Sequence, residues 1–236
     1  MPIIIGGLQK VTLVDYPGKV ACTLFLTGCN FRCPFCYSKE LVLPEEIKKH
    51  PKLDLDYIFS FLKERQGLID GVVLCGGEST IYSELPELCQ KIKAMGFSVK
   101  LDTNGSHPEM LKKLIDNKLI DYIAMDIKAP LEQEKYNQAN GVNVSIKKIK
   151  ESIDLIKKSG IDYEFRSTIV QGLHSEDDII KMAQDIAPAE KYFLQQFRNE
   201  KGTLNPAFAK SQPFSNEVLE KIKINIAPLF NEFGIR

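Results

Sequence analysis

Three cysteines that stand close together are the residues of this chain best suited to chemistry. Cys29, Cys33 and Cys36 occur as Cys-x3-Cys-x2-Cys in the stretch 27–40, TGCNFRCPFCYSKE. Iron–sulfur clusters are normally held by four Cys thiolates, and no fourth Cys follows at a comparable spacing. The spacing therefore predicts a cluster with three protein ligands and one iron left open to another molecule.

Two other uses of these thiols remain open, namely a zinc site and free thiols. A structural zinc ion takes four Cys or His ligands, but none of the three His residues (His50, His107, His174) lies in the loop. The other cysteines (Cys22, Cys75, Cys89) do not form a second Cys-x2-Cys pair. A disulfide framework is disfavoured because six Cys are sparse in 236 residues and because we expect no secretory segment.

Length and charge limit the functions open to the chain. Its 236 residues, 44% of them hydrophobic, can bury a sizeable core, and its 31 basic and 31 acidic residues cancel. This balance argues against a nucleic-acid binder that works by neutralising phosphates. No apolar run approaches the roughly 18 residues of a membrane helix, so we expect a cytoplasmic protein that binds neither membrane nor nucleic acid.

Short apolar runs alternate with helical patterns along the chain. We expect strands at 20–27, 71–75, 97–102, 121–127, 162–170 and 191–196. We expect helices at 55–65, 84–95, 108–118, 145–158, 175–187 and 214–226, with capping serines at Ser83, Ser145 and Ser175 and stops at Gly96 and Gly160. The alternation predicts a parallel α/β fold in one domain over residues 1–236.

Polar residues gather at the ends of these expected strands, where ligands of parallel sheets bind. Each has an ordinary explanation: tight turns at Gly-Gly and Asn-Gly, an ion pair between Asp126 and Lys128 on one strand face, and an anionic partner for Arg166. One ligand spanning the strand ends would explain all of them together. The candidates are Gly76, Gly77, Glu78, Asp102, Thr103, Asn104, Asp126, Lys128, Arg166 and the pair Gln195-Gln196 that ends the last expected strand.

These motifs resemble those of radical S-adenosylmethionine (SAM) enzymes. The cysteines match the cluster motif of that superfamily, including the aromatic Phe35 before the last Cys, and 76–78 resembles its Gly-Gly-Glu motif. The stretch 7–36, with Asp-Tyr-Pro-Gly at 15–18, and the segments LDTNG and MDIK resemble more closely the glycyl-radical-enzyme activating proteins. The resemblance is greatest to the activating proteins of anaerobic ribonucleoside-triphosphate reductase.

The resemblance implies a partial (β/α)6 TIM-like barrel and a specific radical chemistry. A cluster loop (28–38) would hold one [4Fe-4S] cluster, whose open iron takes the amino and carboxylate groups of SAM. One electron, from a small donor protein such as flavodoxin or ferredoxin, would cleave SAM to methionine and a 5′-deoxyadenosyl radical. That radical would remove hydrogen from a Gly of a partner glycyl radical enzyme, so no side chain acts as a catalytic acid or base.

The resemblance also implies roles for the remaining residues. Phe35 and the backbone near Tyr37 would lie against adenine, and 76–78 would hold the amino end of methionine. The 102–104 segment, Asp126 and Lys128 would surround the carboxylate and ribose, with a possible monovalent cation. The other implied contacts are Arg166 near the carboxylate and Gln196 near the ribose.

Three features of this sequence differ from those of the related proteins that the resemblance implies. Ser79 stands where many relatives have Pro after Gly-Gly-Glu, and Gln196 stands near the position of a His in the pyruvate formate-lyase activase. Residues 37–74 contain no Cys, which predicts one cluster and no inserted ferredoxin-like domain. A radical SAM enzyme acting on a small molecule and a non-catalytic, zinc-stabilised binding module are the alternative functions.

Overall fold

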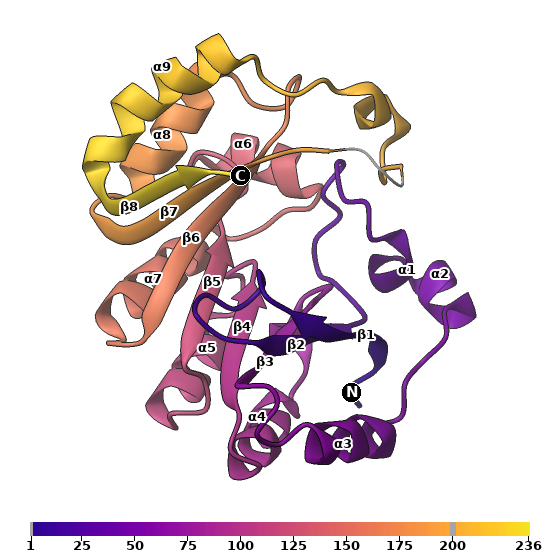
Figure 1. Cartoon of the computed structure of the whole chain (residues 1–236). Coiled ribbons are helices and arrows are strands. Elements are labelled where there is room, and N and C mark those ends of the chain that lie inside the picture. The colour runs from indigo at the N-terminus through magenta and orange to yellow at the C-terminus, as the bar shows by residue number, and fades with distance from the viewer. Residues whose placement is uncertain (1, 199–201) are drawn as a thin grey trace. The chain divides into compact units, whose positions relative to one another are not determined.

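Strands that follow one another in the chain also lie next to one another in the sheet (Figure 1). The computed structural model describes residues 2–198 and 202–236, and in this part the sheet order runs from β1 to β8. The strands are β1 (Ile5–Thr12), β2 (Ala21–Leu26), β3 (Gly71–Gly76), β4 (Ser98–Thr103), β5 (Tyr122–Asp126), β6 (Asp162–Ile169), β7 (Ala189–Gln196) and β8 (Phe230–Ile235).

The outer pairings of the sheet are parallel except at its first strand. β2 pairs with β3, β3 with β4, β6 with β7, and β7 with β8 in parallel, whereas β1 is antiparallel to β2. The six expected strands correspond to β2 through β7, which confirms the parallel α/β fold. β1 and β8 were not predicted from the sequence.

Helices connect most of the strands. They are α1 (Lys39–Val42), α2 (Pro44–Lys49), α3 (Leu55–Glu64), α4 (Leu85–Ala94), α5 (Pro108–Asp116), α6 (Gln133–Asn140), α7 (Ile146–Lys158), α8 (Glu176–Ile186) and α9 (Asn216–Ile226). The six expected helices are α3, α4, α5, α7, α8 and α9. Ser175 caps α8 in a full capping box with Asp178, but the N-cap of α4 is Glu84 instead of the predicted Ser83.

Two compact units share the chain. The first comprises Met1–Asn30, Ser38–Thr103 and His107–Ile123, and the second comprises Phe31–Tyr37, Asn104–Ser106 and Ala124–Arg236. Each unit has a core of fully buried side chains, such as Leu24 and Leu74 in the first and Phe165 and Tyr192 in the second. The assignment of 1–236 to one domain stays a prediction. Within the described residues, no helix is long and apolar enough to cross a membrane.

Candidate active site

Backbone hydrogen bonds fix the part of the cluster loop that belongs to the second unit. The Arg32 N–H donates to the Asn140 carbonyl at 2.7 Å, at the last residue of α6. The Leu204 N–H donates to the Cys36 carbonyl at 2.9 Å, and the Cys36 N–H donates to the Cys33 carbonyl at 3.0 Å. The loop is therefore held at both ends and folded into a turn between its last two cysteines.

A group of buried apolar side chains, here named the apolar wall, lies against Cys33. Phe35, Val170 and Phe197 form a buried cluster, and Cys33 packs against it. The rings of Phe35 and Phe197 meet edge to face, with centroids 6.3 Å apart and an interplanar angle of 78°. Phe35 is only 6% exposed, because its ring is part of the wall, whereas the neighbouring Tyr37 is 53% exposed.

Three charged side chains, from the end of β5, the segment after it and the middle of β6, form an ion-pair network. Lys128 Nζ donates to Asp126 Oδ2 at 2.9 Å, and Arg166 Nε donates to Asp126 Oδ1 at 3.1 Å. Burial opposes the charge of Asp126, but the positive charges of Lys128 and Arg166 outweigh it and lower the pKa of Asp126 to about 2. Asp126 and Lys128 share a face, and Arg166 has an anionic partner, as the sequence predicted.

Lys128 also connects this network to the cluster loop. Its Nζ lies 6.0 Å from the centroid of the Phe35 ring. Burial raises the pKa of the Cys33 thiol to about 11, while the charge of Lys128 lowers it. Iron binds the thiolate and must displace this proton, and a nearby cation stabilises the thiolate that results.

In the first unit, Glu78 lies at the centre of a buried hydrogen-bond cluster. Its side chain is 1% exposed, and Oε1 accepts from the Thr103 hydroxyl at 2.7 Å, the Thr80 N–H at 3.2 Å and the Thr80 hydroxyl. The structure thus brings together two predicted residues, Glu78 and Thr103. Sequence reasoning missed Thr80, although its place two residues after a predicted ligand was a signal.

The Gly-Gly pair permits a very close approach of two backbone segments. The Gly77 N–H donates to the Leu26 carbonyl at 2.8 Å, and the Glu78 N–H donates to the Gly28 carbonyl at 2.8 Å. A Cβ atom on Gly77 would lie 1.8 Å from the Gly28 oxygen. Glycine is therefore required at 77 to place the 76–78 segment beside the residue that precedes Cys29.

Two other predicted residues have local partners. Asp102 forms an ion pair with the buried Lys100. The Asn104 Oδ1 accepts from the Ser106 N–H at 3.0 Å and the Ser106 hydroxyl at 2.6 Å, and Gly105 has a φ of 73°. These bonds confirm that Asn-Gly forms a turn directly after β4.

The register of β6 and β7 separates the two glutamines at the end of β7. Phe193 is paired with Arg166 and Gln195 with Thr168, whereas Gln196 is paired with Ile169. Because successive side chains alternate between faces, Gln195 shares the face of Arg166 and Gln196 lies on the opposite face. The structure therefore does not bring Gln196 together with Arg166 and Asp126, although the sequence grouped them.

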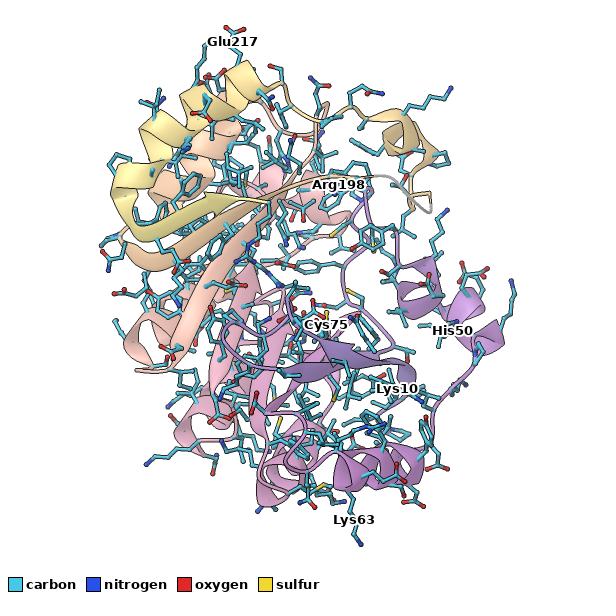
Figure 2. The ribbon with its side chains drawn as sticks, in the orientation of Figure 1. Lys10, His50, Lys63, Cys75, Arg198 and Glu217 are labelled. Carbon is cyan, nitrogen blue, oxygen red and sulfur yellow. The ribbon has the colours of Figure 1, made fainter. Side chains whose placement is uncertain are left out.

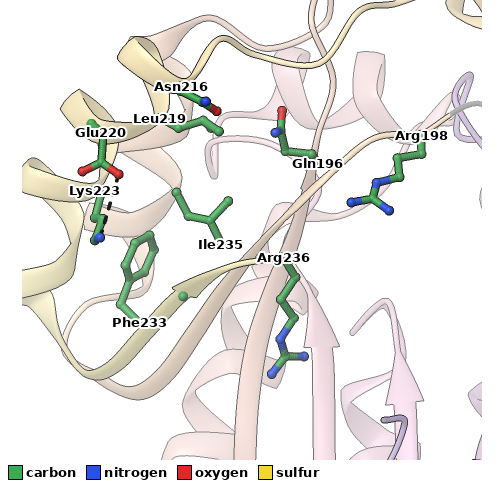
Figure 3. Close-up of a pocket in the computed structure, with 10 residues that line it drawn as sticks. Gln196, Arg198, Asn216, Leu219, Glu220, Lys223, Phe233, Ile235 and Arg236 are labelled. Atoms are coloured by element: carbon green, nitrogen blue, oxygen red, sulfur yellow. Dashed lines mark ion pairs between the residues drawn. The ribbon is translucent and has the colours of Figure 1, made fainter.

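Gln196 instead faces a cavity of about 430 Å³ beside α9, lined also by Asn216, Leu219 and Ile235 (Figure 3). Its Oε1 is buried without a hydrogen-bond partner among the described residues. Figure 3 shows the Arg236 guanidinium directed away from Gln196. Arg236 lies over the Phe193 ring, 3.7 Å from its centroid, on the face of Arg166.

The three histidines and Cys75 are engaged with groups outside the cluster loop. His50, at the end of α2 (Figure 2), bonds through Nε2 to the Gly6 carbonyl at 2.7 Å. His107 Nδ1 lies 3.2 Å from the Thr80 hydroxyl, and His174 bonds to main-chain groups of the second unit. Cys75 packs against the buried core of the first unit.

No three His, Cys, Asp or Glu side chains within 2–198 and 202–236 gather tightly enough to hold one metal ion. A cubane cluster differs from a single ion because its thiolates bind separate irons. The donor set fits such a cluster, because Cys29, Cys33 and Cys36 are partly buried and form no disulfide, and Cys33 lies against the apolar wall and is influenced by the positive charge of Lys128.

Comparison with known proteins decides the family. The sequence profile of the Radical SAM superfamily matches residues 23–186. The chain belongs to the radical SAM superfamily. It is a radical SAM enzyme, and membership implies a [4Fe-4S] cluster and SAM as its cofactors.

Individual relatives refine this assignment. A protein of Methanocaldococcus jannaschii with the provisional name glycyl-radical enzyme activating enzyme is 35% identical, over 95% of this chain and 92% of its own. A radical SAM methyltransferase of Sphaerobacter thermophilus has a similar structure, with a TM-score of 0.69 and 15% identity over 96% of this chain and 68% of its own. SuiB of Streptococcus suis, solved with SAM, gives a TM-score of 0.66 and 14% identity over 88% of this chain and 48% of its own. The structural likenesses confirm the fold class.

Proposed function

We propose that this protein activates a glycyl radical enzyme. The observation that carries the proposal is the match of 35% identity to a relative named for that activity, over nearly the whole of both chains. A match of this extent includes both the cluster loop and the strand ends. It favours an activase over a radical SAM enzyme that acts on a small molecule, although a superfamily alone does not fix the substrate.

In this proposal the three cysteines of the cluster loop hold the cluster and the strand ends hold SAM. A reduced cluster and SAM bound there would supply one-electron cleavage of the sulfonium C–S bond coupled to removal of a Gly hydrogen atom from the partner, with methionine and 5′-deoxyadenosine as the products. Lys128 and Arg166, held by Asp126, present positive charge that suits the SAM carboxylate. Glu78, buried in the first unit, suits the SAM amino group.

The partner and the surroundings are finer parts of the same proposal. The resemblance of 7–36 to activating proteins of anaerobic ribonucleoside-triphosphate reductase makes that reductase the first partner to test. A small one-electron donor, flavodoxin or ferredoxin, would reduce the cluster. Three cluster thiolates require reducing conditions, so we infer that the protein works anaerobically in the cytoplasm.

The decisive experiment is anaerobic reconstitution with iron and sulfide, followed by reduction with SAM and the reductase. The expected result is an electron spin resonance doublet of a glycyl radical on the partner. Cys33→Ala should abolish it, whereas Cys89→Ala, which alters a buried thiol of α4 outside the cluster loop, should retain the cluster and the signal.

Two results would overturn the proposal. One is formation of 5′-deoxyadenosine without a glycyl radical on any glycyl radical enzyme tried, which would favour a small-molecule substrate. The other is stoichiometric zinc without iron or sulfide in anaerobically purified protein, which would favour the binding module.

A further inference from the structure

His174 is a buried histidine in the loop that follows β6. Its side chain lies directly before the Ser175 capping box of α8, and the residue is 6% exposed. The His174 N–H donates to the Val170 carbonyl at 2.9 Å, closing a short turn. Gly172, with a φ of 89°, makes that turn possible.

Both ring nitrogens of His174 bind main-chain groups. The Val170 N–H donates to Nδ1 at 3.0 Å, so Nδ1 carries no proton. Nε2 therefore carries the proton of the neutral ring and donates it to the Lys128 carbonyl at 2.9 Å. Burial lowers the pKa of His174, in agreement with a neutral ring of one fixed tautomer.

The two main-chain groups that the His174 ring binds belong to two residues near Cys33. One is in the apolar wall and the other carries the positive charge that acts on Cys33. Val170 is part of the apolar wall, together with Phe35. Lys128 carries the ammonium that pairs with Asp126 and lies over the Phe35 ring. The His174 imidazole thus links the main chain of Val170, in the apolar wall, to the main chain of Lys128.

We propose that His174 is a positioning residue of this site, which fixes the Lys128 ammonium relative to Cys33 and thereby sets how readily a cluster bound there is reduced. The inference rests on the proposed function only for the presence of the cluster. A positive charge near a thiolate ligand favours the electron-rich, reduced state of the cluster, and charge and hydrogen bonding around a cluster tune its potential. If the Lys128 main chain were released, its ammonium could rotate away from Cys33 and the cluster would become harder to reduce.

Two substitutions separate the two bonds of the ring. In His174→Asn the side-chain oxygen takes the place of Nδ1 and keeps the bond from Val170, but loses Lys128. In His174→Gln the side-chain amide reaches the place of Nε2 and keeps the bond to Lys128, but loses Val170. Ser175→Ala is the matched control, since it weakens the α8 cap without touching Lys128.

The measurements are the midpoint potential of the reconstituted cluster, the rate of 5′-deoxyadenosine formation without any partner enzyme, and the thermal midpoint of each variant. Loss of a hydrogen bond that orients a metal site from outside its ligands typically lowers the activity of that site by about 10-fold or more. We expect His174→Asn to lower the potential and slow SAM cleavage by about 10-fold, with His174→Gln closer to the wild type. Nitrogen chemical shifts of His174 in the unsubstituted protein should show a proton on Nε2 and none on Nδ1.

The proposal is refuted if both variants keep the wild-type potential, or if Ser175→Ala shifts it as much as His174→Asn at equal loss of thermal stability. It is also refuted if the proton is found on Nδ1. None of these readouts uses a glycyl radical enzyme, so they distinguish an error about His174 from an error about the partner.

Discussion

Replacing Gly77 with Ala should damage both the stability of the first unit and the cluster loop. The new Cβ would lie 1.8 Å from the Gly28 oxygen and 2.6 Å from the Gly28 carbonyl carbon. Both are backbone atoms, so no side-chain rotation relieves the contact. The two segments must separate by at least about 1.2 Å to reach the 3.0 Å that real Cβ atoms respect, which breaks the 2.8 Å hydrogen bond from the Glu78 N–H to Gly28.

The cost can be estimated from these two effects. Overpacking of a buried site costs about 1–3 kcal/mol, and the lost backbone hydrogen bond adds about 1 kcal/mol. The free energy of unfolding should therefore fall by about 2–4 kcal/mol. At about 2–4 °C per kcal/mol for a chain of this size, the thermal midpoint should drop by roughly 5–15 °C.

Differential scanning calorimetry of the apoprotein measures this drop. Gly7→Ala in β1 is the matched control, because the nearest atom to its Cβ would be 3.4 Å away, and its midpoint should stay within about 2 °C of the wild type. Since Gly28 precedes Cys29, Gly77→Ala should also lower the iron bound after reconstitution. Equal thermal midpoints and equal iron contents for the two variants would show that the close backbone approach does not matter.

Three further predictions concern single contacts. Thr103→Val removes a buried donor to Glu78 Oε1 and should lower the free energy of unfolding by about 1.5–3 kcal/mol in urea titrations; a change below 0.5 kcal/mol, about the scatter of a neutral substitution, would contradict the bond. Burial would raise the pKa of Asp178, but hydrogen bonds from Lys135 and from the α8 cap lower it to about 2, so its contribution to stability is present above about pH 4 and fades as the pH falls toward 2. Asp178→Asn should flatten that part of the stability profile, and an unchanged profile would contradict the assignment. Gly96→Ala, at a φ of 91° with open space around it, should cost about 1–2 kcal/mol through backbone strain alone, and no loss in the same urea assay would show that the backbone adapts.

The fold was predictable where burial on both faces leaves a continuous apolar run. β3 and β5 are examples, since the first four residues of each strand are buried. β1 and β8 give no such signal. Residues 9–11 of β1 and 231–232 of β8 are exposed, and their strand character comes from pairing with a neighbour that local sequence does not reveal.

Some residues of the candidate site could likewise be predicted from the sequence, and others could not. Residue type and strand alternation were enough to place Asp126 and Lys128 on one face and to expect an anion beside Arg166. The choice between Gln195 and Gln196 depends on the register of β7 against β6, which is set by long-range pairing. The role of His174 gives no signal in the sequence, because its partners are main-chain groups 4 and 46 residues away.

The first strand of the sheet bears on how the protein behaves in concentrated solution. β1 ends the strand order and pairs with β2 alone among the described strands, and such a border exposes main-chain donors and acceptors to other molecules. Its pairing is irregular at two places, between Ile5 and Gly7 and between Gln9 and Thr12, and Lys10 points a charge into solvent there. Both features hinder strand-by-strand growth of fibrils from this border, which suits samples held at the high concentrations that spectroscopy demands.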